Sequence, residues 1–183
     1  MEINNIDFKF RELVIPYREG INEVIIRNKL DKNSIDNDPS WIKMCDHIWI
    51  KYLCLDTKNN SYTNFMYCTK SINGPLHYHH GSVNAFIING TYGIYEHKKY
   101  QKEKDYADAG SYVYAPAGTL HRAYMKVHNG YYLGFSITQG AVIYLNDNHE
   151  FIGYSDVFTQ IDNLKKHYET HNLPLSKIDA IIQ

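Results

Sequence analysis

Three histidines stand within four positions of the sequence, at His77, His79 and His80. His77 and His79 are separated by one residue, so on a strand their side chains point to the same side, and that of His80 points to the other. A buried imidazole has ring nitrogens that are costly to leave without partners. Either these side chains face water, or something inside the protein binds them.

A later segment, GSYVYAPAGTLH, supplies another imidazole. Gly110 and the Pro-Ala-Gly turn at 116–118 lead into His121, 42 residues after His79. A third imidazole from another strand would complete a facial set around a divalent metal, with positions left open for water, oxygen or substrate. Three imidazoles also suit zinc. Together the two segments predict one metal site formed by His77, His79 and His121.

The elements that would position these histidines are strands. From Trp41 the sequence alternates apolar and polar residues in CDHIWIKYLCLD and SYTNFMYCTK, which the turn TKNN separates. Further short strands are predicted at SVNAFII, TYGIYEH, SYVYA, HRAYMKV, YYLGFSI, AVIYL and EFIGY. Many short strands at close spacing, with almost no helical pattern among them, predict an all-β sandwich or barrel.

The two ends of the chain differ from this strand-rich middle. Residues 1–40 contain too few apolar residues for a core of their own, so we expect an N-terminal arm before a barrel at 41–154. Residues 155–183 form a C-terminal helical segment, in which Ser155 is the expected N-cap. We expect its amphipathic helix to cover the barrel with an apolar stripe at Val157, Phe158, Ile161, Leu164 and Tyr168.

Composition narrows the class of protein. The 183 residues suit one domain, and 44% hydrophobic with 21% charged residues is globular. A net charge of −1 argues against binding to nucleic acid or to an anionic membrane surface. The three cysteines form no Cys-x-x-Cys pair, and neither a signal peptide nor a long apolar run is present. We therefore expect a soluble, cytoplasmic protein.

The two histidine segments resemble a known family. GPLHYHHGSVNAFIING resembles the first cupin motif, and GSYVYAPAGTLH resembles the second. Over residues 41–174 the chain is similar to the 2,4′-dihydroxyacetophenone dioxygenase branch of the cupins. That branch is related to acetylacetone dioxygenase and to the zinc-binding cupin of some anti-sigma factors. The resemblance implies a jelly-roll β-barrel that holds one divalent metal per chain on the three histidines.

The sequence departs from the commonest cupin pattern at one ligand position. That pattern has a glutamate five residues after the second histidine, where this chain has Asn84. One explanation is a site of three histidines, as in acetylacetone dioxygenase. The other moves the carboxylate to Glu96 in IYEH, where the dihydroxyacetophenone branch also tends to carry a glutamate.

Strand geometry bears on Glu96. Asn89 and Gly90 are the strongest short hairpin signal, and a two-residue turn there would place Val83 opposite Glu96. On an unbulged strand Val83 shares the face of the histidines, so we predict that Glu96 binds the metal or supports a ligand. A β-bulge near Gly81 would reverse this, with the asparagine turned inward and Glu96 outward.

The resemblance also implies an activity. It points to a non-haem metal dioxygenase, with iron(II) as the expected metal and zinc, nickel or manganese as other choices. The substrates would be O2 and a small hydroxyketone or diketone, with an aryl ketone favoured, and a carbon–carbon bond would break. The alternative is a non-catalytic zinc-binding cupin that acts as a ligand sensor or protein-interaction module. We also expect a homodimer, because barrels of this branch commonly associate and an arm without a core suits crossing to a neighbour.

Overall fold

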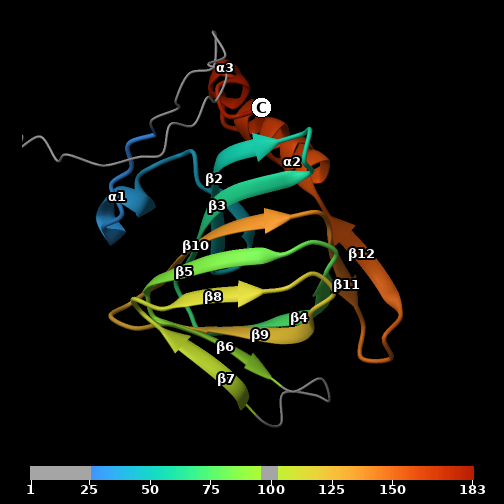
Figure 1. Ribbon diagram of the computed structural model, residues 1–183. Helices are drawn as coiled ribbons and strands as arrows, with labels where there is room; N and C mark the ends of the chain where they lie inside the picture. Colours follow the sequence, from blue (N-terminus) through green and yellow to red (C-terminus); the bar gives the residue numbers. More distant parts are fainter. Residues whose placement is uncertain (1–25, 96–102) are drawn as a thin grey trace, which may run out of the picture.

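Two six-stranded antiparallel sheets form the body of the protein (Figure 1). The structure, a computed structural model, describes residues 26–95 and 103–183. In spatial order, the first sheet contains β1 (Ile42–Cys45), β2 (Ile48–Asp56), β3 (Ser61–Cys68), β10 (Tyr132–Gln139), β5 (Val83–Asn89) and β8 (Tyr112–Ala115). The second contains β12 (Phe151–Ser155), β11 (Val142–Leu145), β4 (Ile72–His79), β9 (Leu120–Lys126), β6 (Thr91–Tyr95) and β7 (Glu103–Asp108). The predicted all-β jelly-roll architecture is confirmed.

The predicted hairpin at Asn89 and Gly90 is wrong. β5 pairs with β10 and β8 in the first sheet, whereas β6 pairs with β7 and β9 in the second. Gly90 has a φ of 88°, and a Cβ there would lie 2.5 Å from the carbonyl oxygen of Lys126. The dipeptide therefore marks a sharp corner that carries the chain from one sheet to the other. Val83 pairs with Thr138 and Ala115.

A second corner follows the paired histidines. β4 ends at His79 in the second sheet and β5 begins at Val83 in the first, so the strand expected to run through both is broken. A Cβ on Gly81 would lie 2.2 Å from the carbonyl oxygen of Gln139. Only glycine fits so close to another backbone, so Gly81 allows the chain to turn at this point.

Three helices stand outside the described sheets: α1 (Lys32–Asp36), α2 (Val157–Thr170) and α3 (Ser176–Asp179). The N-cap of α2 is Asp156, which forms a capping box with Thr159, whereas the predicted cap Ser155 is the last residue of β12. No helix among the described residues is long and apolar enough to cross a membrane.

The apolar stripe of α2 covers one end of the barrel, as expected, but one of the residues predicted to be buried is exposed and another takes its place. Val157, Ile161, Leu164 and Tyr168 are buried in a cluster that also contains residues of β1, β2 and β3. Phe158, however, is 52% exposed, and the buried position belongs to Gln160. Gln160 is polar, but its side-chain oxygen accepts a hydrogen bond from the Tyr52 hydroxyl of β2, which offsets the cost of its burial.

Candidate metal centre

The structure brings the three predicted histidines together. His77 and His79 lie on β4, and His121 lies directly opposite His77 on the neighbouring strand β9. The Nε2 atom of His121 is 2.9 Å from Nε2 of His77 and 3.2 Å from Nε2 of His79. The candidate ligand atoms all lie within 4.8 Å of one another. His79 and His121 are only 7% and 3% exposed, so this is an interior cluster.

Hydrogen bonding among the rings cannot account for this convergence. The Nδ1–H of His77 donates to the carbonyl oxygen of Pro75 at 2.9 Å, which leaves a lone pair on its Nε2. An imidazole nitrogen carries either one proton or one lone pair in the ring plane, so Nε2 of His121 can satisfy only one of its two nitrogen neighbours. A cation at the centre satisfies all three lone pairs at once.

The observed spacing fits a divalent metal. With metal–nitrogen bonds of about 2.0–2.1 Å, adjacent nitrogens are about 3.0 Å apart in an octahedral site and about 3.4 Å apart in a tetrahedral one. The separations of 2.9 and 3.2 Å around His121 lie close to these values. The residues present therefore fit a metal held on one side by three imidazoles.

Burial also keeps the imidazoles in the form that binds a metal. Desolvation lowers the pKa of His79 to about 4, and the neighbouring His77 adds a smaller effect in the same direction. Desolvation likewise lowers the pKa of His77, against the opposing hydrogen bond to Pro75. Near neutral pH both rings are uncharged, so a metal ion does not have to displace a proton from them.

One tyrosine, Tyr144, lies beside this cluster, whereas Tyr52 and Tyr62 are buried in the hydrophobic cluster under α2. Tyr144 of β11 is the cross-strand neighbour of His77, and the two ring centroids are 6.1 Å apart. Its hydroxyl lies 3.3 Å from the Ser155 Oγ. Burial raises the pKa of Tyr62 to about 12 and that of Tyr52 further, so both phenols remain protonated. Sequence reasoning did not single out Tyr144, because only the register of β11 against β4 places it beside His77.

The predicted fourth ligand, Glu96, lies outside the described residues. Its geometric rationale was wrong, because β5 and β6 do not pair. The residue before it, Tyr95, pairs with Arg122, which directly follows His121 on β9. Asn84 points away from the histidines, where its side-chain oxygen accepts a hydrogen bond from the Tyr112 hydroxyl. Among the described residues the cluster consists of three histidines alone.

A groove of about 560 Å³ lies elsewhere, between α1, the edge of the first sheet and the end of α2. Its carboxylates, Asp36 and Asp38, already form ion pairs with Lys32 and Lys51. None of the three clustered histidines lines it. The groove is therefore a feature separate from the candidate metal centre.

The two-sheet fold and its interior histidines define a cupin. More narrowly, the family model of the ChrR cupin-like domain matches residues 34–139, and the chain belongs to this family. A comparison with curated proteins found no match.

Solved structures show the same fold at low sequence identity. An RmlC-like cupin protein from Ralstonia eutropha is 22% identical, with a TM-score of 0.64 over 82% of this chain and 92% of that one. An acetylacetone dioxygenase from Acinetobacter johnsonii is 16% identical, with a TM-score of 0.63 over 84% of this chain and 99% of that one.

Proposed function

We propose that this cupin is a non-haem metal-dependent dioxygenase that uses iron(II) and O2 to break a carbon–carbon bond in a small hydroxyketone or diketone. The observation that carries the proposal is the convergence of three imidazoles on one interior point. The fold shared with an acetylacetone dioxygenase supports it.

The charge of the site favours this substrate class. Three neutral ligands would leave both positive charges of a divalent ion without compensation, and no carboxylate among the described residues joins them. When bound, the metal supplies a Lewis acid with open positions for oxygen ligands. A hydroxyketone or diketone that has lost its acidic proton offers two oxygens and a negative charge, so it complements such a site.

The histidines and Tyr144 would have distinct roles. The hydrogen bond from His77 to Pro75 fixes the tautomer and the orientation of the His77 ring. Tyr144 lies beside His77 and would present its ring to an aryl group of the substrate.

The proposed reaction needs no additional reductant. For a hydroxyketone RCO–CH2OH, the bond between the carbonyl carbon and the hydroxymethyl carbon breaks. One atom of O2 then enters each fragment, which gives RCO2H and formic acid. One O2 is consumed for each substrate molecule.

The test is an oxygen-electrode assay on protein loaded anaerobically with iron(II). We expect stoichiometric O2 consumption and acid formation with a β-diketone or an aryl hydroxyketone, and none with the same protein loaded with zinc. Iron-loaded protein that consumes no O2 with any member of either substrate class would overturn the proposal.

A second candidate function is supported by the family match. The matching model is named for the ChrR cupin-like domain. The resemblance to the zinc-binding cupin of some anti-sigma factors implies a non-catalytic module that senses a ligand or contacts another protein. Protein purified with stoichiometric zinc, without O2 consumption after iron loading, would favour this alternative.

A further inference from the structure

A hydrogen-bonded polar pair lies in the first sheet. Asn64 of β3 is 3% exposed, and its side-chain oxygen accepts a hydrogen bond of 3.1 Å from the Ser136 hydroxyl of β10. The amide nitrogen of Asn64 donates no hydrogen bond to any described residue. A buried N–H group without an acceptor is costly, so a ligand that accepts from it is the first explanation to consider.

The alternation of side chains along β3 places Asn64 inside the barrel. Phe65 packs with Trp41, which precedes the barrel strands, on the outer side of the sheet. Cys68 packs with Met125 of the second sheet and therefore points inward. Neighbouring residues of a strand point to opposite sides, so Asn64 points inward as Cys68 does.

One contact between the two sheets relates Asn64 to His121. Cys68 follows Asn64 by four positions on β3, and Met125 follows His121 by four positions on β9 (68 minus 64, and 125 minus 121). Cys68 and Met125 belong to one buried cluster. Equal steps back along two strands that run in the same direction bring Asn64 and His121 to the same level of the interior.

A second contact between the sheets fixes this direction. Burial, and then the neighbouring Tyr144, raise the pKa of Tyr62, which precedes Asn64 by two positions. Tyr144 is the cross-strand neighbour of His77, which pairs in turn with His121. Asn64 thus lies between the two contacts, on the wall that faces the histidines.

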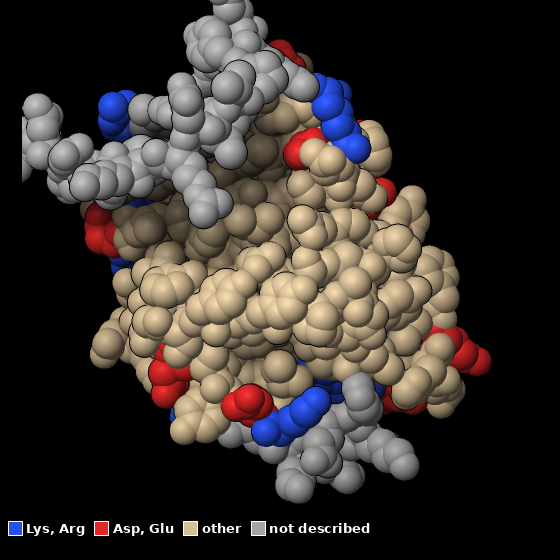
Figure 2. Space-filling view, in the orientation of Figure 1, with Lys and Arg blue, Asp and Glu red and all other residues tan. Residues whose placement is uncertain are grey.

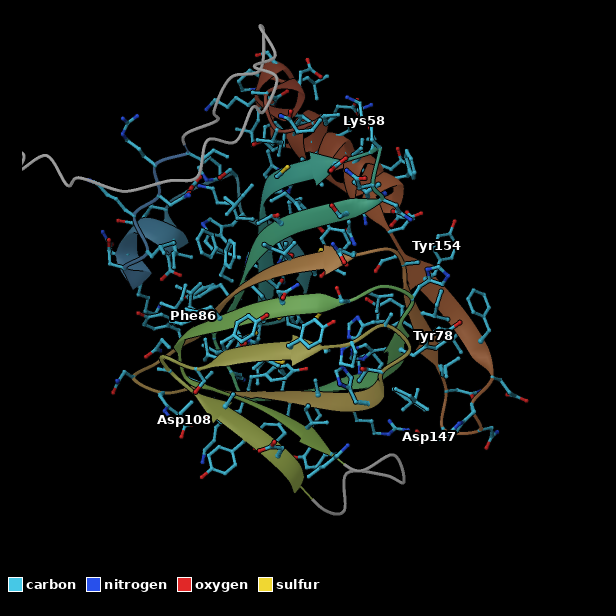
Figure 3. All side chains as sticks on the ribbon, viewed as in Figure 1. Lys58, Tyr78, Phe86, Asp108, Asp147 and Tyr154 are labelled. Atoms are coloured by element: carbon cyan, nitrogen blue, oxygen red, sulfur yellow. The ribbon has the colours of Figure 1, made fainter. Side chains whose placement is uncertain are left out.

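The wall around the polar pair is small and partly open. Ser136 pairs with Ala85 of β5, and both residues remain partly exposed although they point inward. Figure 3 labels Phe86 on the outer side of this sheet, and its neighbour Ala85 points to the opposite side. Solvent therefore reaches the interior at the level of the polar pair.

This wall carries no charge. The sequences of β3, β5 and β10 are SYTNFMYC, VNAFIIN and YLGFSITQ. Figure 2 shows the outer surface of the first sheet without the colours of charged residues across its middle. A negatively charged ligand at the histidines would therefore meet only neutral hydrogen-bond donors on these three strands.

We infer that the Asn64 amide donates a hydrogen bond to an oxygen of the substrate held at the histidine centre, and that Ser136 orients this amide. The inference rests on the proposed function, in which the substrate offers two oxygens and a negative charge. Facing sheets pack about 10 Å apart, so a ligand held on one wall comes within reach of side chains on the other. Hydrogen bonds to charged acceptors are the stronger ones, so Asn64 selects ketones that lose a proton over simple ketones.

The test measures binding without turnover, by calorimetric titration of acetylacetone and of an aryl hydroxyketone into zinc-loaded protein. Asn64→Leu removes the donor at similar size and should weaken binding by about 10- to 100-fold. Ser136→Ala should weaken binding by less, because it removes only the restraint on the amide. The matched variant Asn84→Leu makes the same exchange on the outer side of the sheet, where Asn84 bonds to Tyr112, and should bind as wild type does.

A second variant covers a failure of Asn64→Leu to fold, which circular dichroism would show. Asn64→Asp keeps the shape of the side chain but replaces the donor with a negative charge, so it should weaken binding at least as much. Wild type that binds neither ligand would overturn the inference, as would Asn64 variants with wild-type affinity. Asn64 variants that lose zinc in proportion to ligand binding would also overturn it, because the residue would then act on the metal site.

O2 consumption tests the proposed reaction separately. Iron-loaded protein that consumes no O2, while its zinc form loses affinity with Asn64→Leu, would refute the dioxygenase and leave the role of Asn64 standing. O2 consumption with unchanged affinity in the Asn64 variants would refute the role of Asn64 alone.

Discussion

The lowered pKa of His79 predicts a specific loss of stability when the metal-free protein is acidified. The folded state holds this imidazole neutral down to about pH 4, whereas the unfolded chain takes up a proton at the ordinary value of 6.5. The unfolded state therefore binds more protons between these values, so the free energy of unfolding falls as the pH is lowered from 6.5 towards 4. Above 6.5 both states are neutral, and this contribution is constant.

The size of the effect follows from the same shift. The difference of about 2.5 pKa units corresponds to about 3 kcal/mol, at about 1.4 kcal/mol per unit. The side chain is 7% exposed, so solvent screening reduces this value little. A loss of about 3 kcal/mol is a large fraction of the stability of a domain of this size.

The measurement is urea unfolding of metal-free protein at several pH values, for wild type and for His79→Gln. Carboxylates also titrate in this range, but their contribution is common to both proteins and cancels in the difference. We expect the wild-type free energy to fall by about 3 kcal/mol more than that of the variant. Parallel pH profiles for the two proteins would show that His79 is not held neutral by the fold.

Three further predictions concern the metal and the corner at Gly81. Alanine in place of any one of the three clustered histidines should remove most bound metal, and full occupancy in all three variants, measured by mass spectrometry, would refute the assignment. Asn84→Ala should leave iron(II) retention unchanged, because Asn84 points away from the cluster; a loss of affinity of about 10-fold or more in a metal-competition titration would contradict this. Gly81→Ala should lower the melting temperature and the metal content much more than Gly74→Ala, because the added Cβ would lie 2.2 Å from a backbone oxygen at Gly81 and 3.3 Å from one at Gly74. Equal melting temperatures would show that this corner tolerates a side chain.

The strands could be predicted from sequence because their signal is local. Alternation in segments such as SYTNFMYC is visible within eight residues and gives β3 directly. β7 was not identified, because its sequence EKDYAD is mostly charged and has no apolar alternation. The turn at Asn89 and Gly90 was identified as a turn, but a local signal specifies backbone conformation and not the sheet that the next strand joins.

The site could be predicted only where it depends on parity within one strand. Two positions separated by one residue share a face, so the pairing of His77 with His79 follows from spacing alone. The approach of His121 and Tyr144 depends on the registers of β9 and β11 against β4, which join residues 44 and 67 positions away in sequence (121 minus 77, and 144 minus 77). These are long-range alignments, so the motif resemblance predicted His121, and nothing in the sequence pointed to Tyr144.

All three clustered histidines belong to the second sheet, and this has a consequence for how the protein can change. A bound metal would link β4 to β9. The facing wall of the barrel, which the first sheet forms, contributes none of the three histidines. The buried polar residues Asn64 and Thr138 come from that wall. Under the proposed function, substitutions in that wall would change which substrate binds while the metal-binding strands stay unaltered. For the proposed dioxygenase, catalytic competence and selectivity would thus be encoded on separate strands of one small barrel.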